Sequence, residues 1–463
     1  MASLEKALPI IQTSILQFFG FLPHHPIGIW PSLNFRQKVY SILSTAAVAI
    51  LICGTFGSSC LQSAFFLYGL VHPNSVGVYE QHKGLLVVME RLPSFSINTR
   101  SLLILSVFLF KRNAFSFLLT EASTLIELVF SEKQSRQRLR RKLKLVSLAF
   151  LYGTFAFHVV WQYASWADFM SGATNVNLTS TNALAPLPLP IRTWHFLIID
   201  CFFNILPFCL SQQVYVCGIL SALVVSHCLQ VFAGEIRNEA AMYKNFKKDH
   251  DATKAMAGTG DRLQRWERIH YQTLQLVKSV NTFFGLIFLI TYGFDLLTML
   301  GYTAKIVSDD AQTAFMYAFA VGSVAVFGVY TTVFPFPLVM AHEKCERLAD
   351  ELNHLDFFMK EHASSSVEPT DKHSYQLAAN LRHFEASCRN QVCLFSGMKL
   401  IHFSRAFLLK TWTFVFSFML LAREVLHKED LLQSLISTAI TNRTEYSDCV
   451  YLIHKRSADS GAS

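Results

Sequence analysis

Seven long apolar stretches divide this 463-residue chain. A helix that crosses a lipid bilayer needs about 20 consecutive, mostly apolar residues. The pattern therefore predicts an all-α polytopic membrane protein with seven transmembrane helices. The stretches lie at 38–68, 85–110, 145–169, 193–232, 276–304, 312–340 and 400–422. The second is the weakest, because it contains Glu90, Arg91 and Pro93.

Basic residues gather in alternate connections between these stretches. Four segments hold 28 of the 40 Lys and Arg residues, namely 1–38, 111–145, 234–280 and 341–401. The intervening connections hold one each: Lys83, Arg192 and Lys305. Since positive charge marks the cytoplasmic side of a membrane protein, the bias predicts a cytoplasmic N-terminus and an extracellular C-terminus. Sequons for N-glycosylation at Asn177 and Asn442 fall on the predicted outer side.

Composition agrees with membrane insertion. Hydrophobic residues make up 52% of the chain and charged residues 16%, and the mean hydropathy is +0.33. A soluble domain of this length carries more charge. We therefore expect a multi-pass protein of the plasma membrane, in contact with lipid and without nucleic acid as a partner.

The cytoplasmic segments are amphipathic rather than featureless. Apolar residues recur every three to four positions in 112–142, 341–361 and 375–394. Extended helices there predict a helical collar beneath the membrane, whose apolar faces need a partner such as another subunit. Segment 249–263 lacks this periodicity, contains two glycines and is expected to be a mobile loop.

These observations predict four regions along the chain. Residues 1–340 would form transmembrane helices one to six, whose outer half is considered below as a candidate small-molecule site. Residues 341–394 would form the cytoplasmic anchor, 395–423 the seventh helix and 424–463 an extracellular tail.

Motifs of catalysis are missing from the sequence. It contains no P-loop, no dinucleotide-binding glycine pattern, no HExxH and no GxSxG. No Cys and His spacing matches a zinc site. The sequence predicts neither an enzyme nor a bound cofactor, and the ten cysteines lie mostly in membrane or cytoplasmic segments, where disulfides are not expected.

Polar and aromatic residues in the outer halves of the spans suit a small-molecule cavity, which is typically apolar with a few placed polar groups. Interfacial aromatic belts explain the aromatic residues equally well. Two of the acidic residues, Asp200 and Asp295, are expected near outer helix ends, within reach of water. The candidate ligand-binding residues are His158, Trp161, Gln162, His195, Asp200, Tyr292, Asp295, Met316 and Tyr317.

Several short segments resemble insect gustatory receptors, a branch of the insect chemoreceptor superfamily. One is residues 19–23 (FGFLP), before the first span. Another is residues 280–285 (VNTFFG), in the fifth. The strongest resemblance is in the last span, at 395–397 (FSG), 403–409 (FSRAFLL) and 413–416 (TFVF). Odorant receptors of the same superfamily share the layout and a similar last helix.

The resemblance implies a tetrameric, ligand-gated cation channel. Each subunit would bind a tastant or odorant in the outer half of helices two to six. The seventh helices of a homo- or hetero-tetramer would line one pore, and the collar would hold the subunits together. The implied pore positions share one helix face: Thr413, Phe416, Ser417 and Leu420. Leu420 stands where the family has Gln, so the constriction would be an apolar ring that gates by dewetting.

Three alternatives remain from the sequence. An odorant receptor subunit that works with a co-receptor has the same layout. A G-protein-coupled receptor also has seven spans, but its threading is reversed. A transporter or membrane enzyme is supported only by intramembrane His158, Asp200 and His227.

Overall fold

The computed structural model describes residues 11–22, 34–71, 84–130, 132–175, 200–245, 249–307, 314–365, 372–391, 393–424 and 428. Long helices make up nearly all of this part of the chain. They are α2 (Ile11–Phe18), α3 (Phe35–Val71), α4 (Gly84–Val129), α5 (Lys133–Asn175), α7 (Leu206–Asn245), α8 (Asp249–Val307), α9 (Ala314–Thr332), α10 (Phe336–Ser365) and α11 (Lys372–Asn390). A π-helical turn, η3 (Cys201–Ile205), leads into α7. A last helix spans Arg405–Glu424.

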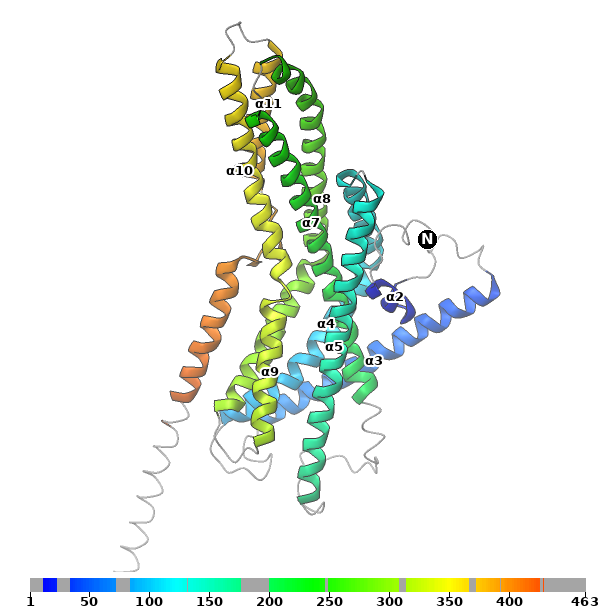
Figure 1. Ribbon diagram of the computed structural model, residues 1–463. Helices are drawn as coiled ribbons and strands as arrows, with labels where there is room; N and C mark the ends of the chain where they lie inside the picture. The colour runs from blue at the N-terminus through cyan, green and yellow to red at the C-terminus, as the bar shows by residue number, and fades with distance from the viewer. Residues whose placement is uncertain are drawn as a thin grey trace, which may run out of the picture.

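The helices form an elongated bundle (Figure 1). Helices α7 and α8 run nearly the length of the molecule. Together with α10, which follows α9, they project beyond the other helices at one end, where α11 packs beside them. Helix α3 leaves the bundle at a steep angle, and the last helix lies beside α9 at the edge. The fold is all-α, apart from a hairpin of two strands, β1 (Ser396–Gly397) and β2 (Ile401–His402).

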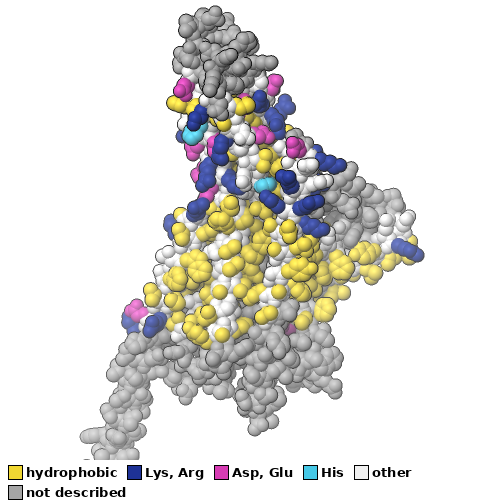
Figure 2. All heavy atoms as spheres, viewed as in Figure 1, with side chains coloured by type: hydrophobic (Ala, Val, Ile, Leu, Met, Phe, Trp, Pro, Cys, Tyr) yellow, Lys and Arg dark blue, Asp and Glu magenta, His cyan; other side chains and the backbone are white. Residues whose placement is uncertain are grey.

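On the face seen in Figure 2, apolar side chains form a band across the middle of the molecule, and charged side chains gather on the described part of the projecting end. Six described helices are long and apolar enough to cross a membrane: those within Phe35–Ala64, Leu92–Val129, Cys201–Lys244, Gly258–Val307, Tyr317–Glu361 and Arg405–Glu424. The expected third span, 145–169, lies in α5. The projecting end carries the segments predicted to be cytoplasmic, and is called the cytoplasmic end below.

The cytoplasmic ends of α7, α8, α10 and α11 pack on one another around apolar side chains, among them Leu352, Leu381 and Phe384. The amphipathic periodicity of the sequence thus produces packed helices here. Burial raises the pKa of the Cys388 thiol in this core, so the thiol stays protonated.

Two details differ from the sequence-based expectations. Residues 249–263 are not a loop, because α8 begins at Asp249. The reason is tertiary: Thr259 donates a hydrogen bond of 2.7 Å to Glu239 of α7, and Leu263 is buried. The seventh helix begins at Arg405 rather than at 395, because the preceding residues form the β1–β2 hairpin.

Candidate functional site

A buried ion pair joins α4 to α8 inside the membrane-spanning bundle. Arg100 Nε lies 2.8 Å from Asp295 Oδ1, and both side chains are 0% exposed. Arg100 Nη1 also donates to Ser211 Oγ of α7 at 3.1 Å. These contacts join α4, α8 and α7. Loss of one partner would leave an unpaired charge in a medium of low dielectric constant, which is strongly unfavourable. The expectation that Asp295 is reached by water is wrong, because its partner Arg100 shields it.

Aromatic rings line one side of this pair. The guanidinium carbon of Arg100 lies 4.8 Å from the centre of the Phe208 ring, a cation–π distance. The His158 ring also contacts Phe208, with ring centres 4.2 Å apart. Phe327 and Tyr330 of α9 continue this group, with ring centres 5.8 Å apart. These rings form an aromatic shell on one side of the polar pair, and apolar walls with a few polar groups are typical of small-molecule sites.

We call Arg100, His158, Ser211, Gln212, Asp295 and Tyr330 the central polar cluster. Lys111 marks the cytoplasmic limit of the apolar run on α4, and Arg100 lies about 16 Å from it along the helix, at 1.5 Å per residue. Since the hydrocarbon core of a bilayer is about 30 Å thick, the cluster lies near its middle. Sequence reasoning proposed His158 and Asp295 as ligand-binding residues but missed the other four members of the cluster. An arginine within an apolar run is a signal that points to a functional or paired position.

The other described candidates lie apart from this cluster. Asp200 precedes the π-helical turn η3, eight residues before Phe208, and accepts a hydrogen bond of 2.5 Å from Asn204 Nδ2. Tyr292 is turned toward the last helix, where its hydroxyl bonds the Thr411 hydroxyl. Tyr317 is 52% exposed.

The remaining candidates fall beyond what the structure describes. His195 and the sequons at Asn177 and Asn442 lie outside the described residues. Trp161, Gln162 and Met316 belong to α5 and α9, but their side chains are not described.

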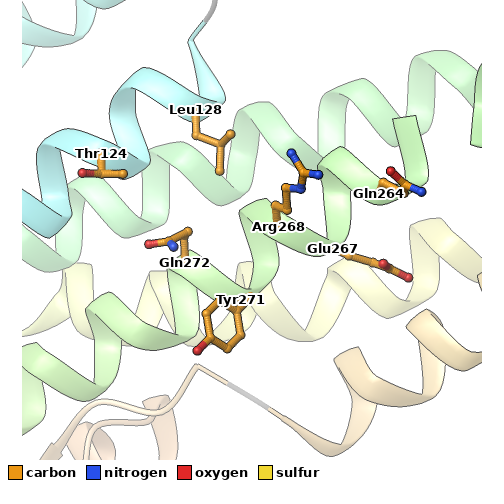
Figure 3. Close-up of a pocket in the computed structure, with 7 residues that line it drawn as sticks. All are labelled: Thr124, Leu128, Gln264, Glu267, Arg268, Tyr271 and Gln272. Atoms are coloured by element: carbon orange, nitrogen blue, oxygen red, sulfur yellow. The ribbon is translucent and has the colours of Figure 1, made fainter. Parts of the chain in front are cut away.

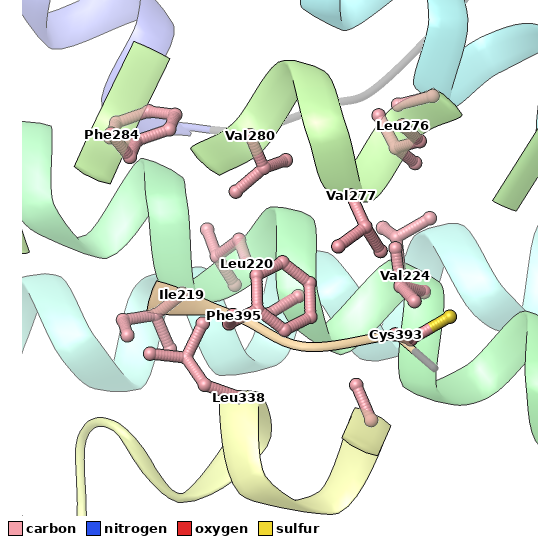
Figure 4. Packing of buried hydrophobic residues seen from close by; sticks show 14 of the residues in the cluster. Ile219, Leu220, Val224, Leu276, Val277, Val280, Phe284, Leu338, Cys393 and Phe395 are labelled. Atoms are coloured by element: carbon pink, nitrogen blue, oxygen red, sulfur yellow. The ribbon is translucent and has the colours of Figure 1, made fainter. Parts of the chain in front are cut away.

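The segment that leads into the last helix is held in the core. Cys393 and Phe395 are both 0% exposed and lie between α7, α8 and α10, surrounded by Ile219, Leu220, Val280 and Leu338 (Figure 4). The Asn281 side chain of α8 forms two hydrogen bonds with the backbone of this segment. Its Nδ2 donates to the Leu394 carbonyl at 2.8 Å, and its Oδ1 accepts from the Ser396 N–H at 3.0 Å.

Two glycines permit the hairpin to approach α8. A Cβ on Gly285 would lie 3.3 Å from Met398 N and from Ser396 O. A Cβ on Gly397 would lie 3.2 Å from Leu289 N. Both distances are tighter than ordinary contacts of a Cβ, so the backbones pack where only glycine fits without adjustment. The hairpin turn itself places Met398 and Lys399 in the left-handed region, at φ 55° and 62°.

The last helix has one packed face and one free face in the single chain. Leu408, Thr411 and Val415 recur at three to four residues and are less than 10% exposed. On the other side, Phe416 is 54% and Leu420 64% exposed, and Thr413 and Ser417 are exposed as well. The four expected pore positions therefore share the face that no described part of this chain covers.

A groove of about 720 Å³ opens between α4 and α8 at the cytoplasmic end (Figure 3). Its lining residues are Thr124, Leu128, Gln264, Glu267, Arg268, Tyr271 and Gln272. Thr124 follows Lys111 by about 20 Å of helix, at 1.5 Å per residue. The groove is therefore separate from the central polar cluster and lies below the lipid.

No group of three or more His, Cys, Asp or Glu side chains suited to a metal ion occurs in the described part of the chain. The nine described cysteines carry no disulfide.

A family model described as "7tm Chemosensory receptor" matches residues 11–368. The chain belongs to the 7tm chemosensory receptor family. It is therefore a multi-pass membrane receptor of the chemosensory class at the plasma membrane, and not an enzyme. A search of curated protein sequences finds no match.

Solved structures show the same fold. The chemosensory receptor superimposes on the insect olfactory receptor OR5 from Machilis hrabei with a TM-score of 0.57 and 9% identity, over 90% of this chain and 98% of that one. The structure of OR5 in complex with eugenol gives a TM-score of 0.57 and 12% identity, over 90% and 99%. At this identity the likeness establishes the fold, and the binding of eugenol is a property of OR5.

Proposed function

We propose that this chemosensory receptor is a subunit of a ligand-gated, non-selective cation channel. Four subunits, identical or mixed, would surround one pore lined by the last helices. The observation that carries the proposal is the free face of that helix. Phe416 and Leu420 lie on it, and a pore around a fourfold axis requires a face that its own subunit leaves uncovered.

The proposed ligand site is the central polar cluster with its aromatic shell. A relative with the same fold has been solved in complex with the small molecule eugenol, which supports a small-molecule ligand for this fold. Charged groups at membrane depth are by default functional positions, and here Arg100 and Asp295 meet at the junction of three helices.

Helix α8 connects the two sites in this proposal. Asp295 and Tyr292 are three residues apart, so they lie within one turn of each other. Asp295 belongs to the ion pair, and Tyr292 bonds Thr411 of the last helix. A ligand that shifts α8 at the cluster would therefore move the last helix through Tyr292.

The gustatory type is favoured over the odorant type by the segment 280–285, whose Asn281 and Gly285 both contact the hairpin. An odorant receptor subunit that needs a co-receptor is the second candidate, because the solved relative is an olfactory receptor. Expression of the chain alone and together with a co-receptor separates the two.

Whole-cell recording tests the proposal. Cells that express the chain, alone or with a co-receptor, are exposed to a panel of small neutral and charged organic compounds, with GDPβS in the pipette to block G proteins. We expect a compound-evoked cation current that persists under this block. A response that GDPβS abolishes, or no current in either setting, would contradict the channel proposal.

A further inference from the structure

Two buried polar side chains beside the ion pair make no hydrogen bond to any residue that the structure describes. Gln212 is 0% exposed, and neither its amide oxygen nor its amide nitrogen has a partner. Tyr330 is 4% exposed, and its hydroxyl also lacks one. An unpaired amide or hydroxyl in an apolar interior is unfavourable, so both groups favour a molecule that forms hydrogen bonds with them.

Both side chains belong to the same region of the bundle. Gln212 lies between Phe208 and Tyr215 on one face of α7, at helical spacing of four and three residues. The guanidinium of Arg100 lies over the Phe208 ring. The ring centre of Phe327 lies 6.5 Å from that of Phe208 and 5.8 Å from that of Tyr330. Both unpaired groups therefore belong to the aromatic group that packs against the ion pair.

The charge of the cluster is balanced without a ligand. Arg100 and Asp295 are both fully buried and neutralise each other. A carboxylate or an ammonium ion added here would bring a third charge into a medium of low dielectric constant with no counter-ion left for it. The groups still in need of a partner, an amide and a phenol, are neutral and can both donate and accept hydrogen bonds.

We propose that the central polar cluster takes a neutral small molecule, with an apolar body for the aromatic shell and a hydroxyl group for Gln212 and Tyr330. This ligand class rests on the proposed function, since the site is the one assigned there to the ligand. It is narrower than that proposal, because it discriminates among molecules of the same carbon skeleton.

Matched compounds test the ligand class by binding rather than by current. The purified full-length receptor in lipid nanodiscs is titrated with several carbon skeletons, each presented as hydrocarbon, alcohol, carboxylic acid and amine, and its thermal unfolding is followed. We expect an alcohol to stabilise the wild-type protein most. In Tyr330→Phe the alcohol should bind about 3- to 10-fold more weakly, the loss of one hydrogen bond, while the hydrocarbon is unaffected.

Tyr330→Phe removes only a hydroxyl that bonds no described residue, so the variant should fold. Gln212→Leu is the second variant and should reduce discrimination between alcohol and hydrocarbon in the same way. Tyr375→Phe is the matched control, since Tyr375 is 78% exposed on α11, and it should behave as wild type. Tighter binding of the acid or the amine, or no alcohol binding, would overturn the ligand class. So would unchanged discrimination in both variants.

The outcome separates this inference from the channel proposal. Alcohol binding that depends on Tyr330, without any evoked current, would leave the ligand class standing and refute the channel. Currents evoked only by acids or amines would leave the channel standing and refute the ligand class.

Discussion

Tyr292 of α8 and Thr411 of the last helix share a hydrogen bond between their hydroxyl groups. It is a side-chain link between the helix that carries Asp295 and the helix proposed to line the pore. The Tyr292 ring also packs on Phe407, with ring centres 4.9 Å apart. The link therefore combines a directional bond with apolar contact.

Removal of this hydrogen bond should weaken the coupling between ligand and pore. In Tyr292→Phe the ring remains and only the hydroxyl is lost. We expect a higher ligand concentration for half-maximal current, by roughly 3- to 10-fold for a bond of 0.5–1.5 kcal/mol, with binding to the closed protein unchanged. Paired current and binding curves measure both. Tyr271→Phe, at an exposed position of α8, is the control, and equal shifts in both variants would refute the role of Tyr292.

The buried ion pair should be essential to the stability of the bundle. Asp295→Asn leaves Arg100 without a counter-charge, and loss of one partner of a buried pair costs about 3–5 kcal/mol. We expect a lower melting temperature for this variant in detergent. The double variant Arg100→Met with Asp295→Leu should recover most of the loss. A double variant less stable than the single one would show that the pair is not the source of the effect.

Close packing of the hairpin on α8 should make Gly285 intolerant of a side chain. The Cβ of Gly285→Ala would meet backbone atoms of Ser396 and Met398, so the hairpin must shift. Gly293→Ala is the matched control on the same helix, since nothing lies within 4 Å of its added Cβ and Ala favours helix by about 1 kcal/mol over Gly. We expect Gly285→Ala to reduce current and stability, and Gly293→Ala to preserve them. Equal effects of both substitutions would refute the packing argument.

A second glycine pair tests the contact of the last helix with α9. A Cβ on Gly328 would lie 2.6 Å from the Trp412 ring, whereas one on Gly322 of the same helix meets nothing within 4 Å. Gly328→Ala should displace Trp412 and alter the resting open probability in single-channel records. Gly322→Ala should leave it unchanged. Identical records from the two variants would mean that this contact does not position the last helix.

Sequence patterns predict the helices of this receptor well. Apolar periodicity depends only on residues that are close in sequence, and the distribution of Lys and Arg indicates the orientation of the helices in the membrane. These patterns do not predict the Arg100–Asp295 pair, since 194 positions separate the partners and only the packing of α4 on α8 brings them together. The same holds for the segments 280–285 and 395–397. The sequence presents them as two separate motifs of a family resemblance, whereas the structure joins them through Asn281, Gly285 and Gly397.

The direction of a side chain also depends on tertiary contacts. Tyr292 and Asp295 lie near each other in sequence and were expected to share one ligand site. The structure turns Tyr292 to Thr411 and Asp295 to Arg100. Rotation of α8 about its axis decides this, and helix rotation is set by its neighbours.

The central claim, that the free face of the last helix lines a cation pore, is tested most directly by the current through Leu420→Gln. Leu420 is 64% exposed on this face, and a polar amide in place of the apolar ring should lower the barrier to wetting. We predict a larger resting current and altered relative permeability of Na⁺ and Ca²⁺ in Leu420→Gln, with a smaller change in Leu421→Gln. Resting current and permeability identical to wild type in Leu420→Gln, at equal surface expression, would contradict the account.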